Sequence, residues 1–320
     1  MVSLLNSNNI VRRVIEIGGS LYIALPKGWT KVYNIKRGDT VYLTIDKIGN
    51  LIVSKAAKSI PRKITITADM TVKERLIAAY LKGYDIIQIR AKELTEKIRA
   101  SIEDALRFLV GLEVVEESRN NIVLQCLGTD TIDLCSLVRR MVTLVRSMID
   151  DAFSAIYDNN MELLNLVIQR DDKVDRLYFF IVRQVRRLIY NHEQLIASKL
   201  TPLDLMDLRL FAKTIEEIAD CCERILLDYS RLRSKEPNLL EELVSYIRES
   251  KDSLLTVFDN AIKSFLNKDI DLALRVKKAL ASLREGLHEM KISDVPRALL
   301  LTKIDHIFAL IEDIVDLITT

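Results

Sequence analysis

The sequence predicts a multi-domain, mainly α-helical protein, in which a small β domain and an α/β module precede two tandem three-helix bundles. Five of the nine glycines fall before residue 50, and only Gly286 follows Gly128, so turns concentrate early in the chain. Residues 130–320 keep the helical period of apolar residues throughout. These observations divide the chain into four predicted domains, at residues 1–60, 61–128, 129–235 and 236–320.

Residues 11–55 contain short β-branched runs that are bounded by turn residues, which is the pattern of strands. The turns are marked by Gly18-Gly19, Gly38-Asp39 and Gly49-Asn50. Four strands are therefore expected in the first domain. Their sequences are VRRVIEI, SLYIAL, TVYLTI and NLIVSK.

Residues 61–128 alternate between strand and helix patterns in the order βαβαββ. The first helix is expected to begin at Thr71, because Glu74 follows three residues later as in a capping box, and to end at Gly83. A second helix is expected over 95–110. This module contains no phosphate-binding loop and no nucleophile elbow.

The remaining chain is expected to form long helices that are separated by Asn- or Pro-containing breaks, such as Asn159-Asn160 and Thr201-Pro202. Helices of this length point to bundles. The basic stretch at 183–190 is expected to be a solvated helix face. The six predicted helices cover about 130–158, 161–194, 202–234, 238–267, 269–290 and 295–319.

The six helices form two sets of three that are related by an internal repeat. A shift of 109 residues places Asp150-Asp151-Ala152 on Asp259-Asn260-Ala261, and a shift of 96 residues places residues 215–220 on 311–316. The last pair reads IEEIAD and IEDIVD. A repeat of this length indicates duplicated units that share one packing arrangement.

Charge is distributed unevenly along the chain. Residues 1–61 carry nine Lys and Arg against three acidic residues, a net charge of +6, so the remainder carries −4 because the whole chain is +2. A polyanion is the expected partner of the basic segment, and cations are the expected partners of the acidic one.

The four cysteines form no CxxC motif, no signal peptide is recognisable, and no run of 18 apolar residues occurs. A cytoplasmic protein without membrane insertion is expected.

Three acidic pairs recur at a spacing of four residues, which places each pair on one face of its helix. If two pairs face each other across neighbouring helices, their repulsion is tolerable only with a cation between them, and oxygen ligands suit hard divalent ions and iron. The predicted metal ligands are Asp171, Asp175, Glu216, Asp220, Glu312 and Asp316.

The alternative is that these acids are ordinary solvated charges, neutralised on the same helix by Arg170, Lys173 and Arg176. Recurrence of the motif in both units favours a metal site. Leu280 and Arg284 stand at the second-unit positions of Asp171 and Asp175. A second metal site should therefore be weaker or absent.

Residues 130–320 resemble the PhoU family of phosphate-uptake regulators, through the repeat and the E/DxxxD motifs of Asp171/Asp175, Glu216/Asp220 and Glu312/Asp316. The resemblance implies two PhoU-like three-helix bundles. It also implies metal clusters of iron or zinc, divalent or trivalent, and a role in restraining phosphate transport and signalling.

Residues 11–55 resemble the swapped-hairpin family typified by AbrB, SpoVT and MazE, from the basic start at Arg12 and Arg13 to the hairpin at Gly49-Asn50. The family folds as an interleaved dimer, so the resemblance implies a homodimer and DNA binding. We add Lys27 and Lys31 to the predicted DNA-binding residues, from their charge near the Leu25-Pro26 turn. Alternatively, the hairpin only dimerises the protein.

The sequence thus predicts a regulator of phosphate uptake and phosphate-responsive transcription, with DNA and a phosphate transporter ATPase or phosphate-signalling protein as partners. The alternative is a dimeric adaptor that restrains such a partner without binding DNA. An enzyme is not expected, because no ExxH pair accompanies the carboxylates and no catalytic loop motif is present.

Overall fold

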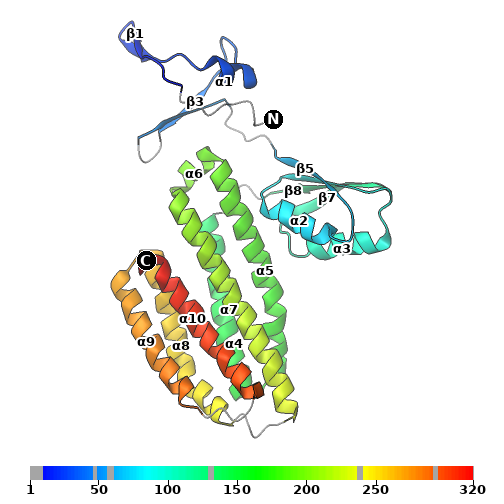
Figure 1. The fold of residues 1–320 in the computed structure, drawn as a ribbon, viewed down its shortest axis with the longest axis vertical. Helices are drawn as coiled ribbons and strands as arrows, with labels where there is room; N and C mark the ends of the chain where they lie inside the picture. Colours follow the sequence, from blue (N-terminus) through cyan, green and yellow to red (C-terminus); the bar gives the residue numbers. More distant parts are fainter. Residues whose placement is uncertain are drawn as a thin grey trace. The chain divides into compact units, whose positions relative to one another are not determined.

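The structure is a computed structural model, and it describes residues 10–45, 49–55, 61–128, 133–235, 241–290 and 295–319. Contacts divide the chain into two compact units, Met1–Ile60 and Pro61–Thr320. Figure 1 labels the elements of both.

The N-terminal unit consists of two antiparallel hairpins with a short helix between them in sequence. The hairpin turns use glycines with positive φ, among them Gly18 (+59°) and Gly49 (+88°), a conformation that side chains with a Cβ rarely adopt. The helix was not expected from the sequence, since its six residues are too few to show a helical period. The elements are β1 (Ile15–Ile17), β2 (Ser20–Tyr22), α1 (Lys27–Val32), β3 (Tyr42–Ile45) and β4 (Leu51–Ser54).

No described residue of the N-terminal unit is fully buried. Its large apolar side chains face solvent instead: Val11 is 84% exposed, Leu21 74% and Ile45 69%. The hairpins of one copy therefore do not form a core among the described residues.

The second unit begins with a four-stranded sheet in the order β5-β6-β8-β7, in which β5 and β6 are parallel and the other pairs antiparallel. The βαβαββ order agrees with the sequence prediction. Thr71 does not cap α2 through its side chain; Asp69 instead accepts hydrogen bonds from the Thr71 backbone N–H and hydroxyl. The elements are β5 (Lys63–Thr67), α2 (Val72–Leu81), β6 (Ile86–Arg90), α3 (Glu96–Leu106), β7 (Leu112–Glu117) and β8 (Asn121–Cys126).

The breaks that the structure describes lie where they are predicted, with one exception, while the predicted breaks near Pro237 and Asp294 fall at 236–240 and 291–294, outside the described residues. The predicted helix over 161–194 ends at Tyr190, because Asn191 takes an extended backbone conformation and its side chain accepts a hydrogen bond from the Gln194 N–H, which begins a new short helix. The described part of the chain has no helix that is both long and apolar enough to cross a membrane. The helices are α4 (Leu134–Tyr157), α5 (Met161–Tyr190), α6 (His192–Ser198), α7 (Pro202–Lys235), α8 (Glu241–Asn267), α9 (Ile270–His288) and α10 (Val295–Thr319).

These long helices pack as two sets of three. Helices α4, α5 and α7 contact one another and form the first bundle, and α8, α9 and α10 form the second. The bundles meet where α7 packs on α10 and α4 on α8 (Figure 1). Buried aliphatic and aromatic side chains fill both interiors. Phe211 of α7 stacks on Phe265 of α8, between the two bundles, with ring centroids 4.2 Å apart.

The α/β module is joined to the first bundle by a buried arginine on α5. The side chain of Arg183 is 0% exposed, and its Nη1 donates to the backbone oxygens of Tyr80 at 2.9 Å and Tyr84 at 2.7 Å. Its Nη2 lies 3.2 Å from Oδ1 of Asp85. The expectation that residues 183–190 form a solvated face is therefore wrong at Arg183, since the module covers this turn of α5.

Candidate metal centre

Three of the predicted ligands meet between α5 and α7. Asp171 and Asp175 lie one turn apart on α5, and Asp220 reaches them from α7, the neighbouring helix of the bundle. One carboxylate oxygen from each lies within 4.8 Å of the others. This distance is short enough for one cation to contact all three, because carboxylate oxygens bind hard cations at about 2.0–2.6 Å.

The cluster is electrostatically unfavourable without a cation. Burial raises the pKa of Asp171 to about 7, with a further contribution from the charge of Asp175. Burial likewise raises the pKa of Asp175 to about 6, and the charges of Glu216 and Asp220 add to it. These carboxyls are therefore partly protonated near neutral pH, and a bound cation would reverse the shift.

Asp171 and Asp175 are not neutralised by cationic side chains of their own helix, which was the alternative to a metal site. Within the described residues neither has an ion pair to a cationic side chain, and Arg170 instead pairs with Asp151 on α4. One oxygen of Asp171, Oδ1, is buried and accepts no hydrogen bond in the described structure. A buried carboxylate oxygen without a hydrogen-bond donor is available to a cation as a ligand.

The two α7 ligands differ in their availability. Glu216 is buried, at 8% exposed, and accepts a 2.5 Å hydrogen bond from Lys213 one turn earlier. Asp220 pairs with Arg224 through Oδ2 at 2.5 Å, and both of these side chains are partly open to solvent. Asp220 thus belongs to the carboxylate cluster and also pairs with the guanidinium group of Arg224. Glu216 lies outside the group of three carboxylates.

The second bundle uses protein cations at the corresponding place. Glu312 accepts a 2.5 Å hydrogen bond from Nη1 of Arg284, and Asp316 lies 2.5 Å from Nζ of Lys277. Leu280 stands on α9 at the position that corresponds to Asp171 on α5, and its side chain is completely buried. The structure therefore does not gather Glu312 and Asp316 into a carboxylate cluster comparable to that of the first bundle.

Two further acids that the sequence analysis missed contribute to the first cluster. Glu223 raises the pKa of Asp171, and Asp172 raises that of Asp175. Glu223 follows Asp220 by three residues, so an i, i+3 extension of the acidic motif could have identified it. Both belong to the acidic rim of the site.

The predicted DNA-binding residues all lie in the N-terminal unit and are exposed. Arg12 and Arg13 lie just before β1, separated from it by Val14, while Lys27 begins α1 and Lys31 lies in the last turn of α1. Lys27 and Lys31 are four residues apart and share one face of the helix.

Fold and site together define a protein with two three-helix bundles and a carboxylate cluster in the first. The PhoU domain family model matches residues 138–228, a segment that contains Asp171, Asp175, Glu216 and Asp220. This part of the chain is therefore similar to the PhoU domain.

Known proteins that are similar to the chain include a curated relative and a solved structure. The phosphate-specific transport system accessory protein PhoU homolog 1 of Thermotoga maritima is 26% identical over 145 residues, which are 45% of this chain and 60% of that protein. The crystal structure of PhoU from Pseudomonas aeruginosa matches with a TM-score of 0.46 and 19% identity, covering 58% of this chain and 93% of that one. The chain thus spans less than two thirds of its curated relative.

Proposed function

We propose that the protein is a metal-binding regulator of phosphate transport. The observation that carries this proposal is the PhoU domain match over residues 138–228, because that segment contains the three-carboxylate cluster. The similar Thermotoga protein is named an accessory protein of a phosphate-specific transport system. A transporter ATPase or a phosphate-signalling protein is accordingly the proposed partner.

The proposed metal ligands are Asp171, Asp175 and Asp220. The buried, unpartnered oxygen of Asp171 supports this set, and an all-carboxylate donor group suits iron or another hard cation better than zinc, which is mostly held by Cys and His. A bound cation would cancel the repulsion among the acids and fix α5 against α7. Glu216 would join only if it released Lys213.

Elemental analysis of protein purified without chelator tests the site. We expect bound iron or another hard metal in the wild type, and its loss in the Asp171→Asn/Asp175→Asn variant. The matched control is Glu312→Gln/Asp316→Asn, which should keep its metal, because Arg284 and Lys277 already neutralise those acids. Equal metal content in the wild type and the Asp171/Asp175 variant would contradict the proposal.

Phosphate uptake by cells tests the regulatory role. Deleting the gene should raise phosphate uptake under phosphate-rich conditions, and restoring the wild-type chain should reverse this. Restoration with the Asp171→Asn/Asp175→Asn variant separates the two parts of the proposal, since failure only with the variant ties regulation to the metal site. Uptake that does not change on deletion would contradict the regulatory role.

We further propose that the N-terminal unit forms a homodimer that binds DNA through Arg12, Arg13, Lys27 and Lys31. Exposure of apolar side chains such as Val11 and Leu21 supports a second copy as the missing half of the core. The excess of positive charge in this unit supports a polyanionic partner. The competing proposal is that the unit only dimerises an adaptor.

A gel shift with promoter DNA at low salt separates these two proposals. The regulator should bind, and Arg12→Ala/Arg13→Ala should weaken binding at all DNA sequences and reduce its salt dependence, because phosphate contacts are lost. Analytical ultracentrifugation should show a dimer for both proteins. A dimer that binds no DNA favours the adaptor, and a monomer contradicts both proposals.

A further inference from the structure

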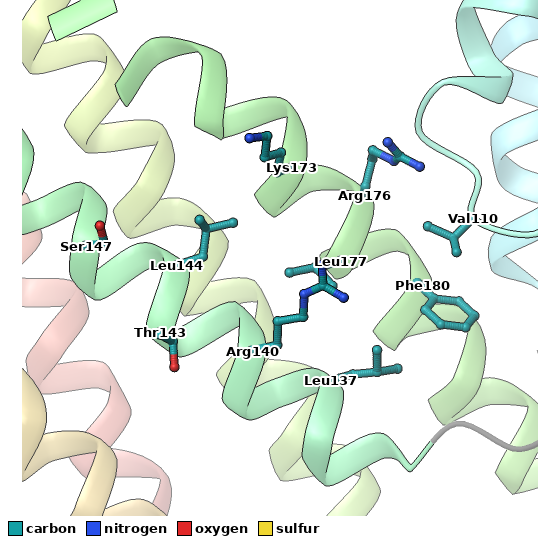
Figure 2. Close-up of a pocket in the computed structure, with 10 residues that line it drawn as sticks. All are labelled: Val110, Leu137, Arg140, Thr143, Leu144, Ser147, Lys173, Arg176, Leu177 and Phe180. Carbon is teal, nitrogen blue, oxygen red and sulfur yellow. The ribbon is translucent and has the colours of Figure 1, made fainter. Parts of the chain in front are cut away.

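A pocket of about 950 Å³ lies on the other side of α5, between α4, α5 and the loop that precedes β7 (Figure 2). Three cationic side chains line it: Arg140 from α4, and Lys173 and Arg176 from α5. No acidic residue is among the described residues that line it. The pocket is therefore positively charged, although it lies on the same helix as the acidic cluster.

The three cations are exposed, and within the described residues none of them takes part in an ion pair or a side-chain hydrogen bond. Lys173 and Arg176 are three residues apart, so they repel each other on one helix face. Asp151, one turn after the pocket residue Ser147, is already paired with Arg170. In Figure 2 the side chains of Lys173 and Arg176 point away from each other, while that of Arg140 lies over Leu177. The structure thus places three positive charges around one hollow, with no acidic residue among the described residues that line it.

The pocket wall between these cations is apolar. Leu137 and Phe180 are buried beneath it, Leu177 is half-buried, and Val110 closes the side next to the α/β module. A bare inorganic anion would bind to the cations but leave the apolar wall exposed to water. A ligand that matches both features carries several negative oxygens on an apolar or aromatic body.

We propose that this pocket binds a phosphorylated small molecule of the nucleotide class. Arg140 and Arg176 would grip its phosphates, because the planar guanidinium group donates two parallel hydrogen bonds to phosphate oxygens. Lys173 would add a third charge, and the base would lie against the half-buried side chains of Leu144 and Leu177. This site is separate from the carboxylate cluster and does not depend on the proposed regulatory function.

Isothermal titration of the full-length protein with ATP, in buffer without divalent cations, tests the proposal. The Arg140→Gln/Arg176→Gln variant should weaken binding by about tenfold or more, because charge-assisted hydrogen bonds to phosphate are lost. The matched control is Arg231→Gln/Arg275→Gln, which removes the same charge from exposed positions elsewhere and should leave binding unchanged. Equal affinity in wild type and the pocket variant, or no saturable binding by the wild type, would overturn the proposal.

A second test introduces a negative charge at an exposed residue of the pocket wall. Thr143 is an exposed helical residue on the pocket wall whose hydroxyl donates to the backbone oxygen four residues earlier. Thr143→Glu should abolish ATP binding by repulsion, while Thr256→Glu, at an exposed helical threonine with the same type of hydrogen bond, should not. ATP binding that survives Thr143→Glu would overturn the assignment to this pocket.

The apolar wall is tested by changing the ligand. Tripolyphosphate carries the phosphates of ATP without the nucleoside, and adenosine carries the nucleoside without the phosphates. Both should bind more weakly than ATP. Tripolyphosphate that binds as tightly as ATP would overturn the nucleotide class, since the wall would then contribute nothing.

Discussion

Asp171 and Asp175 stand one turn apart on a helix that has Arg170, Lys173 and Arg176 beside them, yet they are left without a cationic partner in the described structure. The cations of α5 lie elsewhere: Arg170 pairs with Asp151, and Lys173 and Arg176 line the pocket between α4 and α5. One face of α5 is thus acidic and partly buried, and another is basic and open. Proximity in sequence did not produce neutralisation, because neighbouring residues on a helix face different directions.

The raised pKa values of Asp171 and Asp175 predict a pH dependence for the metal-free protein. Their folded-state pKa values, about 7 and about 6, lie above the ordinary value of 3.8. At pH values between the ordinary and the folded-state pKa, the folded chain therefore binds more protons than the unfolded chain. The free energy of unfolding should therefore fall as pH rises from about 4 to 7. The Asp171→Asn/Asp175→Asn variant should remove part of this fall, on the order of 1 kcal/mol after solvent screening.

Urea unfolding of chelator-treated protein at several pH values measures the effect. The difference between wild type and variant is the informative quantity, because other carboxylates titrate in the same range. Glu312→Gln/Asp316→Asn serves as the control for removal of two charges. If the wild type and the Asp171/Asp175 variant lose stability in parallel, the raised pKa values are refuted.

The helices show the repeat in their caps as well as in their acidic motifs. Asn159 and Lys268 both have left-handed backbone, with φ of +56° and +55°, although neither is glycine. The next residue, Asn160 or Asp269, accepts hydrogen bonds from the first free N–H groups of α5 or α9. The two units therefore reverse direction by the same device at positions related by the 109-residue shift.

Removal of these caps should weaken each bundle by a similar amount. Asn160→Ala and Asp269→Ala should each lower the free energy of unfolding by about 1 kcal/mol, because N–H groups at the helix start lose their acceptor. Thermal unfolding measures the change. Asp158→Ala, an exposed neighbour in the same turn, should have little effect, and a loss at Asp158 equal to that at Asn160 would argue against capping.

At the scale of the whole second unit, the α/β module and the first bundle are joined through a few specific contacts. Arg183 is central, since its guanidinium group satisfies two backbone oxygens of the module and pairs with Asp85. Phe108 of the module also meets Phe179 of α5 edge to face, with ring centroids 6.4 Å apart. The module is thus held in place by a buried charge and by aromatic packing.

Arg183→Met should destabilise this junction strongly, by about 3–5 kcal/mol, because the oxygens of Tyr80 and Tyr84 and the carboxylate of Asp85 lose a buried partner. Hydrogen exchange should show faster exchange in α2 than in the wild type. Arg170→Met, which removes a more exposed pair, should cost less and leave exchange in α2 unchanged. Normal protection of α2 in Arg183→Met would mean that Arg183 is not what holds the module.

Most elements are predictable from the sequence, and each exception has a physical cause. Helix α1 was too short to show periodicity, and Asn191 interrupted a helix because its side chain offered an alternative partner to the backbone. The pairing of Glu216 with Lys213 was not foreseen, since a charged residue three positions away competes with a distant cluster. The pocket at Arg140 was missed because its cations come from two helices.

The sequence by itself determined the order of most elements, the repeat of the long helices and the acidic motifs, because periodicity and turn residues can be read from the sequence alone. Tertiary structure alone decided which acids meet. Asp220 lies close to Asp171 and Asp175 because α7 packs on α5. In the second bundle Glu312 instead accepts a hydrogen bond from Arg284. Electrostatic partners are chosen by distance in space, and helix packing sets that distance.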